Sequence, residues 1–174
     1  MNENGLKNCF VEHFTEDFTV IDEVPGRFVV DGSKVVIDYF LYPKPNLITK
    51  GFVPEWFGVE VKSPDRDGAK KGLRVAWQAI TYSQSEFEDH RIGQDKIRPS
   101  FVLIYPSLAN FFGSQQEAYY LVCLLQKANV GYVEIDARRG RWNIRFGANS
   151  YFHSERGLSK TPSVSTKRNV GSWK

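Results

Sequence analysis

Apolar side chains recur every three or four positions in three segments of the chain, and this spacing predicts amphipathic helices. In the first segment the apolar positions are Leu6, Phe10 and Phe14. The three predicted helices span residues 4 to about 14, 69 to about 87 and 114 to about 128. Each places an apolar stripe on one side, as expected for helices that pack on a sheet.

β-branched and aromatic residues dominate the stretches between these helices, in short runs that predict strands. The predicted strands are residues 18–21, 27–30, 34–41, 56–62, 101–105, 131–135 and 141–146. Pro25-Gly26 and Asp31-Gly32 are expected to form turns, the second within a hairpin. Residues 88–98 are charged and are predicted to be irregular, whereas 101–105 is apolar enough for a central strand buried on both faces.

This order of elements predicts an α/β domain with a mixed central β-sheet flanked by helices. We expect residues 1–152 to form that single domain and residues 153–174 to form a basic, flexible tail. The net charge of +3 divides into +4 for this tail and −1 for the rest. That distribution is compatible with nucleic-acid binding, and equally with an ordinary solvated tail.

Cysteine usage and hydropathy limit the location of the protein. The two cysteines, Cys9 and Cys123, lie in apolar helical surroundings and indicate neither a disulfide framework nor a zinc site. We expect no signal peptide and no membrane contact, because no basic segment precedes an apolar run at the N-terminus and no run is long enough to span a bilayer. A reducing cytoplasm is therefore the expected location.

Two of the apolar strands carry charged side chains. Alternation places Val36, Asp38 and Phe40 on one face of their strand, and Ile37 and Tyr39 on the other. A lone buried carboxylate is costly, so Asp38 needs a partner. A metal ion, a lysine from the next strand or a backbone donor would each serve.

The next strand, residues 56–62, places Glu60 and Lys62 on one face and Phe57, Val59 and Val61 on the other. A carboxylate and an ammonium thus stand side by side on a mostly apolar strand. Taken alone, the pair is more simply a solvated strand face.

The long middle helix carries a row of polar side chains at four-residue spacing, beside its apolar stripe. The row consists of Lys70, Arg74, Gln78 and Tyr82. Next to a carboxylate site such a row fits a phosphate backbone. Without that site it would be an ordinary solvated helix face.

An acidic residue inside a strand, Glu-x-Lys on the next strand and Gln-x-x-x-Tyr on the following helix form an ordered pattern. It resembles the PD-(D/E)XK nuclease superfamily, and most closely its RecB-like branch. The resemblance covers roughly residues 5–105 and implies a restriction-endonuclease-like core. Two departures are that Val-Val-Ile precedes Asp38 in place of the family's proline, and that no cysteines for an iron–sulfur cluster are present.

The resemblance implies metal-dependent hydrolysis of DNA phosphodiester bonds. Asp38, Glu60 and the carbonyl of Val61 would hold Mg²⁺ or Mn²⁺. Glu12 of the first helix would be a further ligand, although an ordinary exposed helix glutamate is the simpler interpretation, and His13 and Glu16 compete with it for this place. The N-terminal motif of the superfamily is not clearly matched.

The remaining roles fall to basic and polar side chains. Lys62 would orient or activate the attacking water, or stabilise the charge that develops. Gln78, also a catalytic candidate, and Tyr82 would support the site and contact the DNA strand. Lys70, Lys71 and Arg74 would bind phosphates. A second basic patch on the C-terminal hairpin, or a solvated hairpin balanced by acids, consists of Arg138, Arg139, Arg141 and Arg145.

Three hypotheses of different classes follow. The first is a small metal-dependent deoxyribonuclease of phage, plasmid or defence type, acting alone or as a homodimer. The second is a non-catalytic DNA- or protein-binding module on the same fold. The third is a plain α/β interaction domain, which predicts that Asp38 and Glu60 lie far apart, whereas the first puts their carboxylates within reach of one cation.

Overall fold

Ten strands and four α-helices make up the part of the chain that this computed structural model describes, residues 2–64 and 68–159. The helices are α1 (Glu3–Phe14), α2 (Pro45–Ile48), α3 (Gly68–Ser83) and α4 (Gln115–Leu125). The strands are β1 (Phe18–Phe28), β2 (Lys34–Pro43), β3 (Phe57–Val61), β4 (Ser85–Asp89), β5 (Gln94–Ile97), β6 (Val102–Tyr105), β7 (Val130–Asp136), β8 (Arg141–Phe146), β9 (Asn149–His153) and β10 (Gly157–Leu158).

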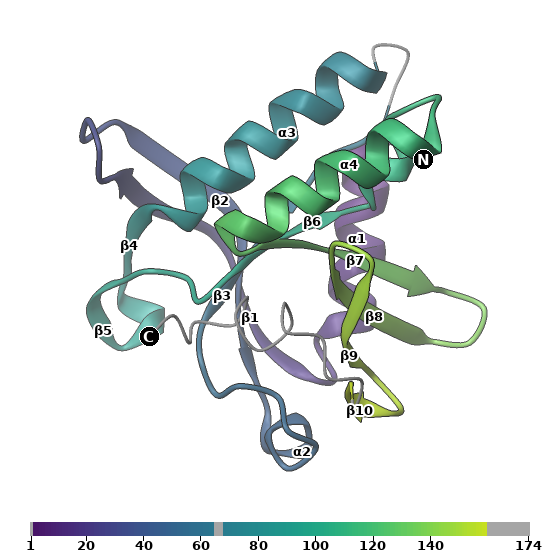
Figure 1. Cartoon of the computed structure of the whole chain (residues 1–174). Coiled ribbons are helices and arrows are strands. Elements are labelled where there is room, and N and C mark those ends of the chain that lie inside the picture. The colour runs from purple at the N-terminus through teal and green to yellow at the C-terminus, as the bar shows by residue number, and fades with distance from the viewer. Residues whose placement is uncertain (1, 65–67, 160–174) are drawn as a thin grey trace.

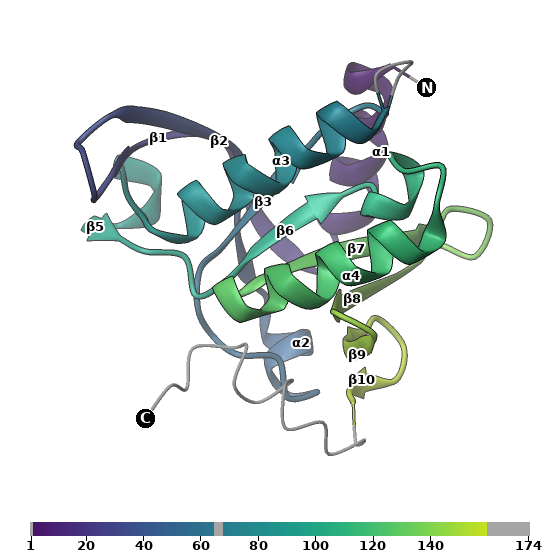
Figure 2. The same ribbon diagram turned by 45° about the horizontal axis from the view of Figure 1, so that its top comes forward.

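All ten strands belong to one mixed sheet in the order β10-β9-β8-β7-β6-β3-β2-β1-β4-β5. The central pairs β3–β6 and β6–β7 are parallel, and the other pairs are antiparallel. Helices α3 and α4 lie side by side on one face of the sheet, and α1 covers the other (Figures 1 and 2). The expected α/β architecture with a mixed sheet and flanking helices is therefore confirmed.

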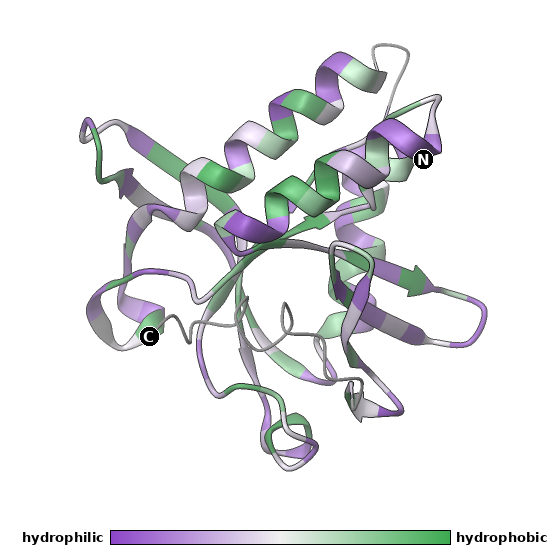
Figure 3. Ribbon diagram, viewed as in Figure 1, coloured by the Kyte–Doolittle hydropathy of each residue, from purple (hydrophilic) through white to green (hydrophobic). Residues whose placement is uncertain are grey.

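Each face of the sheet has its own hydrophobic core. The core under α1 is aromatic: the rings of Phe10 and Phe14 stack with centroids 4.3 Å apart, and Phe14 lies 5.2 Å from Trp142 of β8. Burying one such ring stabilises the fold by about 2–3 kcal/mol. The polypeptide is hydrophobic along β6, the predicted central strand, whereas the β7–β8 loop is hydrophilic (Figure 3).

Pro25-Gly26 does not form the expected turn, because both residues lie inside the long strand β1. Gly26 is paired with Val35 of β2 on one side and with Phe87 of β4 on the other. A Cβ atom added to Gly26 would lie 2.6 Å from a ring carbon of Phe87 and 2.7 Å from the Glu86 carbonyl oxygen. The glycine is thus required for the close approach of β4, and this tertiary pairing overrides the local turn preference.

Gly26→Ala is expected to lower the free energy of unfolding by about 1–3 kcal/mol, because the new methyl group meets backbone that cannot move alone. Urea denaturation measures the effect. Gly113→Ala is the matched control, since nothing lies within 4 Å of a Cβ at that position. Equal stability of the two variants would contradict the close approach.

The long helix ends earlier than expected, at Ser83 rather than near Phe87. The hydroxyls of Ser83 and Ser85 donate to the carbonyls of Ile80 and Thr81, so the last carbonyls of α3 are satisfied by side chains. Much of the stretch 88–98, expected to be irregular, is ordered instead: β4 ends at Asp89, His90–Ile92 form a 3-10 turn, and β5 spans Gln94–Ile97.

The sheet continues past residue 152, where we expected the domain to end. Strand β9 runs through His153, and β10 adds two further residues that pair with β9. The remainder of the expected tail, residues 160–174, lies outside the described residues. Within the described ranges, no helix is long and apolar enough to cross a membrane.

Candidate functional site

Strands β2 and β3 separate where their charged residues begin. They are paired from Tyr39–Val59 to Leu41–Phe57, and beyond this point the Val61 N–H donates to Asp38 Oδ2 over 2.8 Å instead of to a strand carbonyl. A backbone donor was one of the three partners expected for Asp38, and the Val61 N–H is such a donor. The carboxylate takes the place of one rung of the ladder, which holds it at the opening between the strands.

The alternation of β2 changes at Asp38. Tyr39 packs on the α1 face, but Ile37 packs on the α3 face together with Phe40, so the prediction that Ile37 and Tyr39 share a face is wrong. The residue opposite in β1, Glu23, has a left-handed φ of 48°, and pairing continues on both sides of this position. Both strands therefore change face here, which places Asp38 at a bend.

Glu60 is the acidic partner of Asp38. It is only 4% exposed, and its neighbours Phe57, Val59 and Val61 pack in the opposite core, as the alternation of β3 predicted. Its carboxyl hydrogen-bonds that of Asp38. Burial, followed by the charge of Asp38, raises the pKa of Glu60 to about 8. The two carboxyls are thus in contact, contrary to the expectation for a plain interaction domain.

Helix α1 contributes two charged side chains that sequence analysis did not select. Lys7 Nζ lies 2.5 Å from Asp38 Oδ1, and Lys62 Nζ lies 3.2 Å from the Glu3 carboxylate. Burial opposes the charge of Lys7, but the hydrogen bond and charge of Asp38 outweigh it, so its pKa is raised. The available signal was the Glu-x-x-x-Lys spacing in the first turns of α1, which puts both side chains on one face.

The structure does not bring Glu12 to this site. Glu12 is exposed, and five residues of helix turn it about 140° away from Lys7. Glu16 is also exposed and follows the end of α1. Across the described residues, no group of three His, Cys, Asp or Glu side chains could hold a metal ion. The expectation of a third acidic metal ligand is therefore wrong.

Tyr82 and Gln78, the two α3 residues expected at the site, differ in whether their polar atoms have partners. Tyr82 is 6% exposed and donates to the Val36 carbonyl over 3.0 Å, so it joins α3 to β2 and is not available to the DNA strand as expected. Burial, then the charges of Glu60 and Asp38, raise its pKa. Gln78 hydrogen-bonds the Tyr82 hydroxyl, while its buried Oε1 has no partner among the described residues.

The expected phosphate contacts divide into two groups. Lys70 and Arg74 are exposed on α3, whereas Lys71 is partly buried and already interacts within the protein. On the C-terminal hairpin, three arginines pair with nearby acids, which favours the balanced hairpin over a basic patch. These pairs are Arg139–Asp136 (3.8 Å), Arg141–Glu155 (2.5 Å) and Arg145–Glu134 (3.4 Å).

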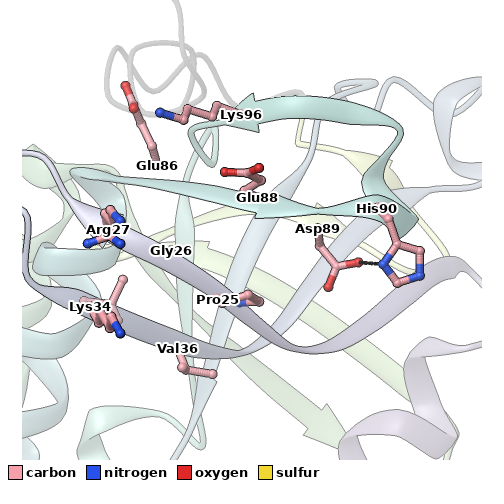
Figure 4. A pocket seen from close by; sticks show the side chains of 11 residues that line it. Pro25, Gly26, Arg27, Lys34, Val36, Glu86, Glu88, Asp89, His90 and Lys96 are labelled. Carbon is pink, nitrogen blue, oxygen red and sulfur yellow. Dashed lines mark ion pairs between the residues drawn. The ribbon is translucent and has the colours of Figure 1, made fainter.

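A groove of about 670 Å³ lies away from this site, between the β1–β2 hairpin and β4–β5 (Figure 4). Arg27 and Lys34 line one side of it, and Glu86, Glu88 and Lys96 line the other. Basic and acidic side chains face each other across it. None of the expected site residues lines the groove.

The oxygen atoms at the opening are of the chemical kind that hard divalent cations bind. Asp38 and Glu60 supply carboxylate oxygens, and the orphaned Gln78 Oε1 is a buried acceptor on the adjoining helix. The backbone N–H of Val61 points toward β2, where it donates to Asp38, whereas the N–H of the next residue, Lys62, points the other way and donates to the Tyr105 carbonyl of β6. Oxygen ligands of this kind are those that Mg²⁺ and Mn²⁺ prefer.

Comparisons with known proteins gave no match of any kind: no family model matches the chain, and neither does any curated protein or solved structure.

Proposed function

We propose that the protein is a divalent-metal-dependent nuclease that hydrolyses phosphodiester bonds in DNA. The observation that carries this proposal is the buried Glu60 carboxyl in contact with Asp38, at an opening of the sheet that also presents Lys62. A stable fold gains nothing from two carboxyls packed together in this way. The core of α1, β1–β3, α3 and β6 supports the restriction-endonuclease-like assignment that the sequence pattern implies.

Each group at the opening has a task in such a reaction. A divalent cation held by Asp38 and Glu60 supplies activation of a water and neutralises charge on the phosphate oxygens. Lys62 stands at the end of β3 with a partly exposed ammonium that can donate to the water or to a phosphate oxygen. Gln78 Oε1 can accept from the water or from an ordered ligand.

DNA affinity would come from the exposed cations of α3. Lys70 and Arg74 lie on the helix that carries Gln78, and the charge of Arg74 acts on Tyr82 beside the site. Contacts of this kind hold the phosphate backbone without reading sequence and weaken as salt rises.

The decisive experiment incubates the purified protein with labelled single-stranded, duplex and branched DNA in Mg²⁺, Mn²⁺ or EDTA. Cutting should require the cation, disappear in Lys62→Ala and persist in Lys34→Ala, a matched exposed lysine outside the site. Cutting that persists in EDTA or in Lys62→Ala would refute the assignment.

A non-catalytic DNA- or protein-binding module is the second candidate. It is favoured by the two ion pairs from α1, because Lys7 already neutralises Asp38 and Glu3 already holds Lys62. DNA binding without cutting under every cation would establish this module instead.

A further inference from the structure

Four charged side chains form an alternating row across the opening. Lys62 pairs with Glu3 at 3.2 Å, and Lys7 pairs with Asp38 at 2.5 Å. The two pairs are linked, because the charge of Glu3 also acts on Lys7. Glu3 therefore stands between two lysines, only one of which it holds.

Asp38 has little spare capacity in this arrangement. Its Oδ2 accepts from the Val61 N–H, and its Oδ1 is taken by the Lys7 ammonium. A divalent cation on Asp38 and an ammonium on the same oxygen are like charges at contact distance, so they oppose each other. Binding of the cation thus favours departure of Lys7.

The Lys7 side chain can move away from Asp38 without movement of the backbone. Its side chain is 26% exposed and has a long, flexible stem. Glu3 lies one helical turn earlier on the same face of α1, the spacing at which a carboxylate and an ammonium pair well. If Glu3 takes Lys7, it must release Lys62.

We propose that Glu3 exchanges Lys62 for Lys7 when Asp38 binds a divalent cation, so that α1 couples cation binding to the release of Lys62 toward the site. Glu3 and Lys7 are then positioning residues that act through Lys62 and Asp38. The inference deepens the proposed function and rests on it.

Cation affinity measured without DNA tests the exchange. Calorimetry with Mn²⁺ should show binding about tenfold tighter in Lys7→Met than in the unchanged protein, because the competing ammonium is gone. Glu3→Gln should weaken binding about threefold, because Lys7 loses its alternative partner. In the Lys7→Met background, Glu3→Gln should have no effect.

The double variant separates exchange from simple electrostatics. If Glu3 and Lys7 act on the cation only through space, their effects add, and the double variant shows both. Additive effects would overturn the exchange. Thermal melts of all variants confirm folding, and Lys50→Met, an exposed lysine elsewhere, should leave Mn²⁺ affinity unchanged.

Lys62 itself provides a second measurement. With ¹³C-methylated lysines, the Lys62 resonance (assigned with Lys62→Arg) should shift on addition of Mg²⁺ in the unchanged protein. In Glu3→Gln it should start at the shifted position and stay there. If the chemical shift of Lys62 does not change while Mg²⁺ binds, the exchange is overturned.

Failures of the two proposals are distinguishable. Absence of Mn²⁺ binding in the unchanged protein and in Lys7→Met overturns the exchange together with the proposed function. Binding whose affinity is the same in Lys7→Met overturns the exchange alone.

Discussion

Replacing Glu60 with glutamine should lower the rate of the proposed cation-dependent DNA cleavage by about 10³-fold, which corresponds to about 4 kcal/mol of transition-state stabilisation. The amide has the size and shape of the carboxyl, so it fits the same buried position on β3. It removes one negative charge from the carboxyl pair with Asp38 and leaves one fewer anionic oxygen for the cation. Single-turnover rates at saturating Mn²⁺ measure the loss.

The matched control for this experiment is Glu88→Gln, which changes an exposed glutamate that lines the distant groove. Its cleavage rate should equal that of the unchanged protein. A Glu60→Gln variant that cuts DNA within about threefold of the normal rate would show that the carboxyl pair does not carry the reaction.

Local sequence patterns correctly predicted the direction of Glu60 and the need of Asp38 for a partner. The alternation of Phe57, Val59 and Val61 fixed the direction of Glu60, because a strand whose apolar face is buried has only one register that keeps it buried. The cost of burying a lone carboxylate likewise predicted that Asp38 has a partner, and the Val61 N–H and the Lys7 ammonium both bind it. These inferences depend on neighbours in the chain and on one general energetic rule.

What the sequence left out depends on distant parts of the chain. Lys7 is 31 positions from Asp38, and Glu3 is 59 positions from Lys62, so no local pattern could assign these pairs. Glu12 was chosen by family resemblance, but the rotation of α1 decides which acidic residue faces the sheet. Which face of a helix packs against a particular strand is decided by tertiary packing and does not follow from the spacing of apolar residues along the helix.

Two other predictions from the sequence are wrong for the same reason, a contact with a distant part of the chain. Pro25-Gly26 has strong turn preference, yet β4 pairs against Gly26 and keeps the segment extended. Tyr82 lies on a polar row by spacing alone, but its ring is buried and its hydroxyl bonds a β2 carbonyl. In both cases a tertiary contact outweighs a local preference of about 1 kcal/mol or less.

In the cation-free protein, Glu60 should reduce stability as the pH rises. The folded state holds the pKa of this carboxyl at about 8, against 4.5 for the free group, so folding favours its protonated form. Stability from this group is complete below about pH 4.5 and is lost progressively until about pH 8. Between pH 6 and pH 9 the loss should be about 3 kcal/mol, at about 1.4 kcal/mol per unit of pKa.

Urea denaturation in EDTA at a series of pH values measures this loss. Glu60→Gln has no titrating group at the position, so it should gain about 3 kcal/mol of stability relative to the unchanged protein between pH 6 and pH 9. Glu88→Gln should follow the unchanged protein, because its carboxyl is exposed. Parallel stability curves for Glu60→Gln and the unchanged protein would contradict the buried, proton-holding state of Glu60.

Adding Mn²⁺ to the same experiment connects stability to function. A cation that binds only the folded state stabilises it by mass action, and it needs the carboxyl pair in its ionised form. The unchanged protein should therefore recover stability with Mn²⁺ at pH 8–9, whereas Glu60→Gln should recover much less. A residue whose removal stabilises the cation-free fold but abolishes this recovery is retained for the cation, since packing alone would favour the glutamine.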